Sequence, residues 1–192
     1  MSTDTYRTIY DLLETLPVVS SHEHHGTDDF QAGLTLDRIL EQSYVSWLDV
    51  APGSDTTSRA AFLAQCRHNS YYVWLEKGFQ RVYGLEEKIT PENWEGISRR
   101  ISARHADPAA HIRILTETGR YRRAVQDTYW DYGSDVGHPE LFSPTMRTDM
   151  FVRCFHPDVR DHDDNNPFLA YPDAPTRDFD DYLDYVKTLF AG

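Results

Sequence analysis

The sequence predicts an α/β fold with a parallel sheet. Three short segments, residues 18–25, 123–128 and 150–155, contain the β-branched, aromatic and apolar residues that favour strands. Helical patterns precede the first segment, fill the gap between the first two and follow the third. Strands separated by long helical crossovers pair in parallel, so these segments are expected to share one sheet.

The N-terminal half is expected to hold one strand between helical segments. Residues 4–16 carry apolar side chains at helical spacing and stop before Pro17. Val18 and Val19 then open the first strand, which is expected to be buried. A helical insert over about residues 34–118 follows, and its helices are delimited by capping residues, prolines and a closing glycine: Thr35, Thr90-Pro91, Asp107-Pro108 and Gly119.

The C-terminal half is expected to contain two more strands and one helix. A polar stretch separates the strand over residues 123–128 from the strand over residues 150–155. Residues 159–177 have the composition of a loop, and residues 179–189 carry apolar side chains at helical spacing. No repeat and no clear linker divides the chain, so a single domain over residues 1–192 is expected.

Two histidines at the end of the first strand form the candidate metal site. Side chains alternate along a strand, so His22 and His24 share a face while Glu23 points away. Their Cα atoms are expected about 6.5–7 Å apart, from where both imidazoles reach one ion at about 2.0–2.1 Å. Because the chain has nine histidines, ordinary surface histidines at a strand end are the alternative interpretation.

Polar side chains also end the other two predicted strands. Asp127 closes the second strand, and His156 and Asp158 follow the third. The carboxyl ends of parallel strands lie at one edge of a sheet, where functional groups gather. The acidic run that continues through Asp161 to Asp164 lacks the glycine and the closing glutamate of a calcium loop and is interpreted as a solvated loop.

The composition restricts the partners that the chain can bind. A net charge of −12, from 19 basic and 31 acidic residues, disfavours nucleic acids and anionic membranes. We expect no signal peptide and no membrane span. Cys66 and Cys154 are isolated thiols, typical of a reducing, cytoplasmic compartment. The expected partner is a small-molecule substrate, and assembly into a homo-oligomer stays open.

A series of motifs resembles the amidohydrolase superfamily, and within it most the uronate isomerase branch. The motifs occur in the family's order: His22 with His24, the run Asn69–Leu75, Tyr83-Gly84, Gln126-Asp127-Thr128 and Phe155-His156-Pro157-Asp158. The resemblance implies a partial TIM-type (β/α) barrel, consisting of its first three strand-helix units with the insert between strands 1 and 2. It also implies that the remaining metal ligands would lie beyond Gly192, so that this chain alone is expected to be inactive.

Two positions depart from the pattern of the isomerase branch. The branch carries a His-Tyr pair after the first strand, where this chain has Ser43-Tyr44. The family arginine after the third strand is replaced here by His156. Both changes weaken the case for isomerisation of uronic acids, whereas the His22–His24 pair is unaffected.

With this resemblance, the chain is predicted to be the N-terminal portion of a metal-dependent hydrolase. A divalent ion bound to His22 and His24 would activate water. Zinc is the expected metal, with manganese and iron as the alternatives. Tyr44 is predicted to donate a hydrogen bond to substrate, Asp127 to orient a ligand histidine and His156 to bind an anion or move a proton. The structural alternatives are plain packing for Tyr44, a helix or turn cap for Asp127, and a loop position without function for His156.

Two other functions stay open at this point. One is an aldose-ketose isomerase of sugar acids, as the resemblance implies. The other is a non-catalytic fragment or interaction module, since the helices over residues 58–105 are rich in aromatic residues that often form interfaces.

Overall fold

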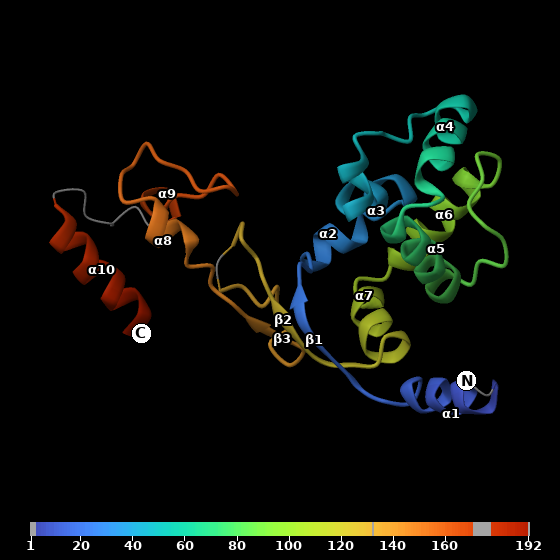
Figure 1. Ribbon diagram of the computed structural model, residues 1–192, viewed down its shortest axis with the longest axis horizontal. Coiled ribbons are helices and arrows are strands. Elements are labelled where there is room, and N and C mark those ends of the chain that lie inside the picture. The colour runs from blue at the N-terminus through green and yellow to red at the C-terminus, as the bar shows by residue number, and fades with distance from the viewer. Residues whose placement is uncertain (1–2, 132, 171–177, 192) are drawn as a thin grey trace. The chain divides into compact units, whose positions relative to one another are not determined.

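The computed structural model describes residues 3–131, 133–170 and 178–191. Over these residues the chain combines helices with a small sheet of three strands in the order β1-β2-β3 (Figure 1). The predicted α/β class is therefore confirmed. The finer expectation of a partial barrel stays a prediction.

The chain divides into two compact units. The first, called here the helical unit, comprises residues 1–19 and 26–123. The second, called here the strand-end unit, comprises residues 20–25 and 124–192. The candidate ligands His22 and His24 belong to the strand-end unit together with Asp127.

The helical unit confirms the predicted helical insert. Thr35 begins one of its helices as expected, since its side chain accepts a hydrogen bond of 3.1 Å from the Arg38 N–H. Gly119 ends the last turn as expected, its N–H bonded to the Ile114 carbonyl. The elements are α1 (Thr3–Leu13), α2 (Asp28–Ala32), α3 (Leu36–Gln42), the 3-10 helix η1 (Tyr44–Leu48), α4 (Thr56–Cys66), α5 (Ser70–Tyr83), α6 (Trp94–His105), α7 (Ala110–Arg113) and the π turn η2 (Ile114–Thr118).

Two predicted helix starts lie before the observed ones. The Thr90 hydroxyl accepts from the Asn93 N–H at 3.3 Å, and α6 begins only after this turn. The Asp107 carboxylate accepts from the Ala109 N–H at 3.0 Å, and α7 follows. Short polar side chains stabilise turns as readily as helix starts, and here they form the turns.

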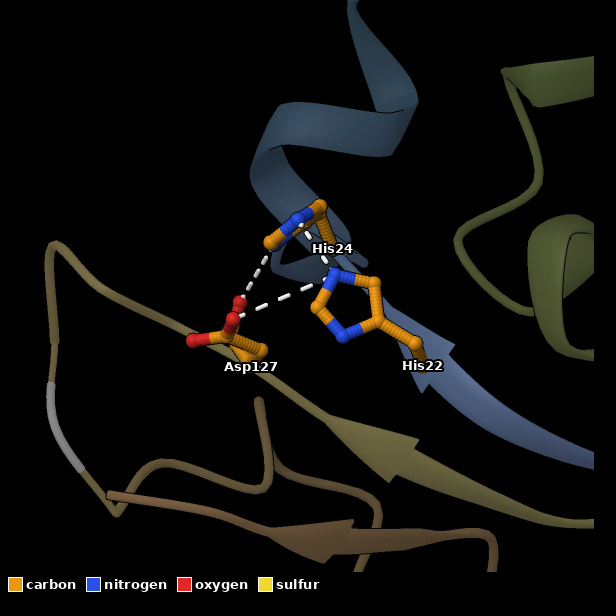
Figure 2. Close-up of side chains that lie close together, drawn as sticks. All are labelled: His22, His24 and Asp127. Atoms are coloured by element: carbon orange, nitrogen blue, oxygen red, sulfur yellow. Dashed lines mark hydrogen bonds and ion pairs between the residues drawn. The ribbon is translucent and has the colours of Figure 1, made fainter. Parts of the chain in front are cut away.

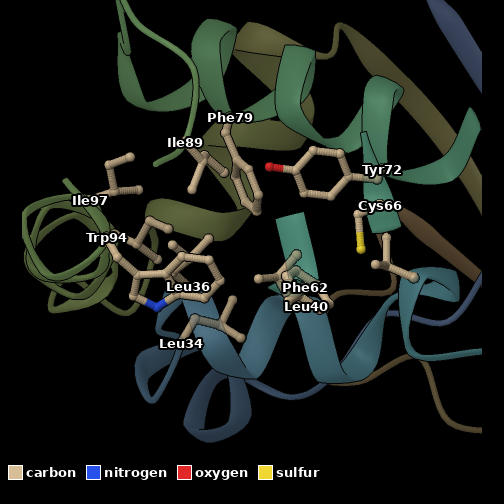
Figure 3. Packing of buried hydrophobic residues seen from close by; sticks show 12 residues of the cluster. Leu34, Leu36, Leu40, Phe62, Cys66, Tyr72, Phe79, Ile89, Trp94 and Ile97 are labelled. Atoms are coloured by element: carbon tan, nitrogen blue, oxygen red, sulfur yellow. The ribbon is translucent and has the colours of Figure 1, made fainter. Parts of the chain in front are cut away.

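The core of the helical unit is built from apolar side chains of several helices. Trp94, Leu36 and Ile101 are fully buried, and Phe62 is 1% exposed. Figure 3 shows these helices converging on that cluster, in which the Phe62 and Trp94 rings meet edge to face at 6.1 Å. Burying each of these side chains stabilises the fold by about 1.5–3 kcal/mol, so the insert has a core of its own.

The three strands form a small parallel sheet. β2 pairs with β3 in parallel. β1 runs beside β2 in the same direction, because the Val18 N–H bonds to the Arg120 carbonyl at one end and the Asp127 N–H bonds to the Glu23 carbonyl at the other. The strands are β1 (Val18–Glu23), β2 (Tyr121–Gln126), which begins two residues before its predicted range, and β3 (Phe142–Pro144).

The third strand does not lie where the sequence predicted it. Residues 150–155 were expected to be a strand, but they overlap the helix α8 (Asp149–Arg153). Met150 and Cys154 are buried while Val152 is 75% exposed, which is helical spacing rather than strand alternation. The aromatic and β-branched composition favours a strand, and the packing of this segment overrides that preference.

The predicted burial of the first strand is wrong for the described chain. β1 is the outer strand in the sheet order, and Val19 is 68% exposed. β-branched residues favour the strand conformation, whereas the burial of a strand depends on the segments that pack against it. In a closed barrel a further strand would pair with β1. Among the described residues β1 lies at the edge of the sheet, so the barrel stays a prediction.

The C-terminal residues add short helices to the strand-end unit. The predicted helix over 179–189 is confirmed as α10 (Phe179–Ala191). The expected loop over 159–177 contains the short helix α9 (Pro167–Ala170), and its residues 171–177 lie outside the described residues. The buried Tyr182 hydroxyl donates to the Phe151 carbonyl at 2.9 Å and ties α10 to α8.

Two further expectations concern thiols and membranes. Cys66 and Cys154 are free thiols, as predicted. Both are buried, and burial raises the pKa of Cys66 to about 11. Within the described ranges, every helix is too short or too polar to cross a lipid bilayer.

Candidate metal centre

The imidazoles of His22 and His24 face each other at the end of β1. Their Nε2 atoms lie 2.9 Å apart, and the ring centroids are 4.5 Å apart with perpendicular planes. Figure 2 shows both rings turned toward each other and toward Asp127. The strand alternation that predicted a shared face therefore describes the observed pair correctly.

The orientation of His24 is fixed by a hydrogen bond from its other nitrogen. Nδ1 of His24 lies 2.7 Å from the backbone carbonyl oxygen of Asp127. A carbonyl only accepts, so Nδ1 carries the proton and Nε2 of the neutral ring keeps its lone pair. The Tyr129 ring packs edge-on against the same imidazole at 5.7 Å. This is the arrangement by which proteins commonly prepare a histidine for a metal.

Asp127 brings a carboxylate to the two imidazoles. It directly follows β2, its side chain is 9% exposed, and its Oδ2 lies 3.9 Å from Nε2 of His22. Ligand atoms of His22, His24 and Asp127 all lie within 4.8 Å of one another. Two segments about a hundred residues apart in sequence thus present one set of nitrogen and oxygen donors, called here the His-His-Asp cluster.

Arg147 holds the carboxylate of Asp127. Its Nε–H donates to Oδ2 at 2.8 Å and to Oδ1 at 3.1 Å, and its Nη1 bonds to Asp163. The hydrogen bond to Asp127 is the main reason that the pKa of Arg147 lies above its usual value, and the charges of both aspartates add to it. The Arg147 guanidinium also lies 5.1 Å from the Tyr129 ring centroid.

The donor set fits a small divalent cation. Two nitrogens bound at about 2.0–2.1 Å are about 2.9 Å apart at a right angle and about 3.3–3.4 Å apart at the tetrahedral angle. The observed 2.9 Å equals the first value, and a tetrahedral ion needs an opening of roughly 0.4 Å. At the tetrahedral angle a nitrogen and an oxygen on one ion are about 3.3–3.5 Å apart, so Oδ2 of Asp127, at 3.9 Å from Nε2 of His22, would have to approach by roughly 0.5 Å.

Tyr44, the first predicted catalytic residue, lies in the helical unit. It is 44% exposed, and its ring meets Trp47 at 4.6 Å and Tyr71 at 5.2 Å. These contacts agree with the packing alternative that accompanied its prediction. Its role toward substrate stays a prediction.

His156 lies in the strand-end unit, but not at the end of a strand. It follows α8 instead of the predicted third strand, and its side chain is 61% exposed. Its Nδ1 accepts from the Asp158 N–H at 3.2 Å. Among the described residues, the potential metal-ligand groups do not include it. Its predicted role in binding an anion or moving a proton is not tested by this placement.

The acidic run after His156 serves the structure of its own loop. Asp161 Oδ1 accepts from the N–H groups of Asp163 and Asn165, both at 2.9 Å. Asp163 pairs with Arg147 and lies 3.2 Å from Nε2 of His162. Donor atoms of Asp161, His162 and Asp163 also lie within 4.8 Å of one another, but this group offers one imidazole instead of two, and backbone amides and Arg147 bond to its carboxylates.

Two residues of the centre escaped sequence reasoning. Arg147 lies in a polar stretch with no motif, 20 residues after the aspartate that it holds. In the sequence Gln126 is distinguished only as the first residue of the Gln126-Asp127-Thr128 motif, although its side chain is fully buried and bonded to His25. A fully buried glutamine is recognisable as special only when the burial is known.

Comparisons with known proteins give no family assignment. A scan against known protein families finds no match to this chain, and a search of curated proteins finds no significant match. The case for a metal centre therefore rests on the geometry of the His-His-Asp cluster.

Proposed function

We propose that this chain provides the divalent-metal centre of a metal-dependent hydrolase of the amidohydrolase type, with His22 and His24 as imidazole ligands. The observation that carries the proposal is the facing pair of Nε2 atoms 2.9 Å apart, one of them left with its lone pair by the bond from Nδ1 to Asp127. Zinc suits this mixed imidazole and carboxylate set best, with manganese and iron as alternatives.

The side chains around the pair have separate tasks in this proposal. A divalent ion at such a site lowers the pKa of a bound water toward about 7. His24 holds its nitrogen in place through Asp127, and the Asp127 carboxylate offers a third donor atom at 3.9 Å from His22. Arg147 pairs with that carboxylate and offsets its charge.

Zinc affinity tests the ligand assignment. Purified protein is titrated with zinc against a chromophoric chelator, beside His22→Ala, His24→Ala and the double variant. We expect one strong site in the parent and a rise in the Kd of at least about 100-fold in each single variant, since loss of a direct ligand outweighs loss of its supporting partner. His68→Ala is the matched control, because this exposed histidine bonds only to its neighbour Arg67 in the described contacts.

The cobalt spectrum gives a second reading of the same site. Tetrahedral or five-coordinate cobalt absorbs visible light far more strongly than octahedral cobalt, and an imidazole ligand shifts the bands. Loss of this absorption in the double variant and its retention in His68→Ala would support the assignment. A parent that binds neither zinc nor manganese nor iron, or a double variant that binds as tightly as the parent, overturns it.

Turnover tests the hydrolase assignment. Protein loaded with zinc or manganese is assayed on a panel of esters, lactones and amides, and on uronates for ketose formation. Hydrolysis that disappears in the double variant and persists in His68→Ala supports the proposal. Ketose formation would favour the isomerase instead. Because this chain alone is expected to be inactive, turnover is the informative result and its absence does not distinguish the proposals.

A further inference from the structure

A fully buried glutamine is bonded to the backbone next to the metal ligands. Gln126 is the last residue of β2, and its side chain is 0% exposed. Its Nε2–H donates to the His25 carbonyl at 2.6 Å, and its Oε1 accepts from the His25 N–H at 3.2 Å. One amide side chain thus satisfies both backbone groups of a single residue.

This pair of bonds holds the chain two residues beyond the end of β1. The final backbone bond between β1 and β2 runs from the Asp127 N–H to the Glu23 carbonyl at 2.8 Å. β1 ends at that residue. The Gln126 amide then offers His25 a donor and an acceptor, as a neighbouring strand would.

His24 lies between these two connections. Its backbone is held on one side by the bond at Glu23 and on the other by the amide bonds at His25. Its imidazole reaches the Asp127 carbonyl at 2.7 Å only if the backbone stays at this distance from β2. Gln126 cannot move away, because its own carbonyl accepts from both the N–H and the hydroxyl of Thr145.

We propose that Gln126 is a positioning residue of the metal centre: its side-chain amide fixes the His24 backbone, so that Nδ1 stays on the Asp127 carbonyl and Nε2 faces His22. The inference rests on the proposed function, since a prepared histidine matters chemically only where a cation binds. Supporting partners of metal ligands typically change metal affinity 10–100-fold when they are removed.

The test combines zinc affinity with the tautomer of His24. Gln126→Met keeps the length of the side chain and suits a buried site, but offers neither hydrogen bond. We expect a zinc Kd about 10–100-fold above that of the parent, with the circular dichroism of the folded chain retained. In the zinc-free protein, nitrogen-15 NMR of the imidazole should report Nδ1–H for the parent and a mixture of tautomers for the variant.

Two further variants keep the test decisive. Gln126→Asn retains the amide but is one methylene too short for both bonds, so it should weaken zinc binding as the methionine does. Gln31→Met replaces another buried glutamine, 8% exposed and located in the helical unit, and controls for the general cost of this exchange. It should leave both the zinc Kd and the His24 tautomer unchanged.

Each outcome has a defined meaning. A Kd within about twofold of the parent in both Gln126 variants, or a loss of affinity that Gln31→Met reproduces, overturns the positioning role. If the parent binds no metal, the proposed function fails, and the tautomer alone decides on Gln126. An unchanged Nδ1–H signal in Gln126→Met then overturns the inference, and a tautomer mixture upholds the structural link from Gln126 to His24.

Discussion

The imidazole Nδ1 of His24 lies 2.7 Å from the backbone carbonyl oxygen of Asp127, a residue 103 positions further along the chain. This single bond connects the end of β1 to the end of β2 and sets which nitrogen of His24 can meet a cation. It also changes the interpretation of Asp127. The sequence predicted that Asp127 would orient a ligand histidine, and its backbone carbonyl is placed to do so whatever its carboxylate does.

Removing Arg147 should make the thermal stability of the strand-end unit more dependent on bound metal. In Arg147→Met the Asp127 carboxylate, only 9% exposed, loses its charged partner, which we expect to cost about 1.5–3 kcal/mol of unfolding free energy. Zinc can then pair with the freed carboxylate, so the rise in melting temperature on adding zinc should be larger than in the parent. Arg153→Met, which removes an exposed arginine paired with Asp149, is the control. An equal or smaller zinc effect in Arg147→Met would argue against Asp127 as a third ligand.

Acid should destabilise the helical unit through His105. Burial lowers the pKa of this imidazole below its usual value, and the nearby His111 and Arg104 lower it further. The unfolded chain then binds the proton more readily than the folded chain. His105 therefore costs no stability above a pH of about 6.5, and the free energy of unfolding falls as the pH drops below it. Urea midpoints at about pH 8, 6.5 and 5 measure this decline.

His105→Gln separates this effect from general acid sensitivity. Glutamine can still bond to the Tyr83 hydroxyl, which lies 2.9 Å from Nε2 of His105, but it does not titrate. The decline in the urea midpoint should therefore be shallower than in the parent, while His68→Gln should follow the parent. A decline as steep in His105→Gln as in the parent would show that other groups cause it.

Truncating Phe62 should unfold the helical unit far more easily. Phe62 is 1% exposed and contacts the rings of Trp94 and Tyr72, so Phe62→Ala leaves a cavity and should cost about 3–5 kcal/mol. Trp74→Ala is the control, because that ring is 68% exposed and should cost less than about 1 kcal/mol. Urea unfolding followed by circular dichroism measures both changes, and similar losses in the two variants would contradict the observed core.

Substitutions in α8 can distinguish the observed helix from the predicted strand. Val152 is 75% exposed on α8, so Val152→Ala should leave stability unchanged or raise it by up to about 0.5 kcal/mol, since alanine favours helices. In a strand the same change would reduce stability. Phe151→Ala, at a residue 6% exposed, should cost about 3–5 kcal/mol and shows that the segment contributes to packing. Urea unfolding of both variants is the measurement.

The sequence by itself determined the local features of this protein. Helical spacing predicted the insert and α10, the Thr35 cap began its helix, and the period of two along β1 placed His22 and His24 on one face. These features depend on backbone geometry and near neighbours, which the order of residues specifies directly.

Only the tertiary structure decided which distant groups meet. It placed residues 150–153 of the predicted strand in α8 and left Val19 exposed at the sheet edge. It also brought Arg147 to Asp127 and the Gln126 amide to His25, beside the two ligand histidines. Burial and long-range hydrogen bonds arise from packing between segments, and packing can override the intrinsic preference of any one of them.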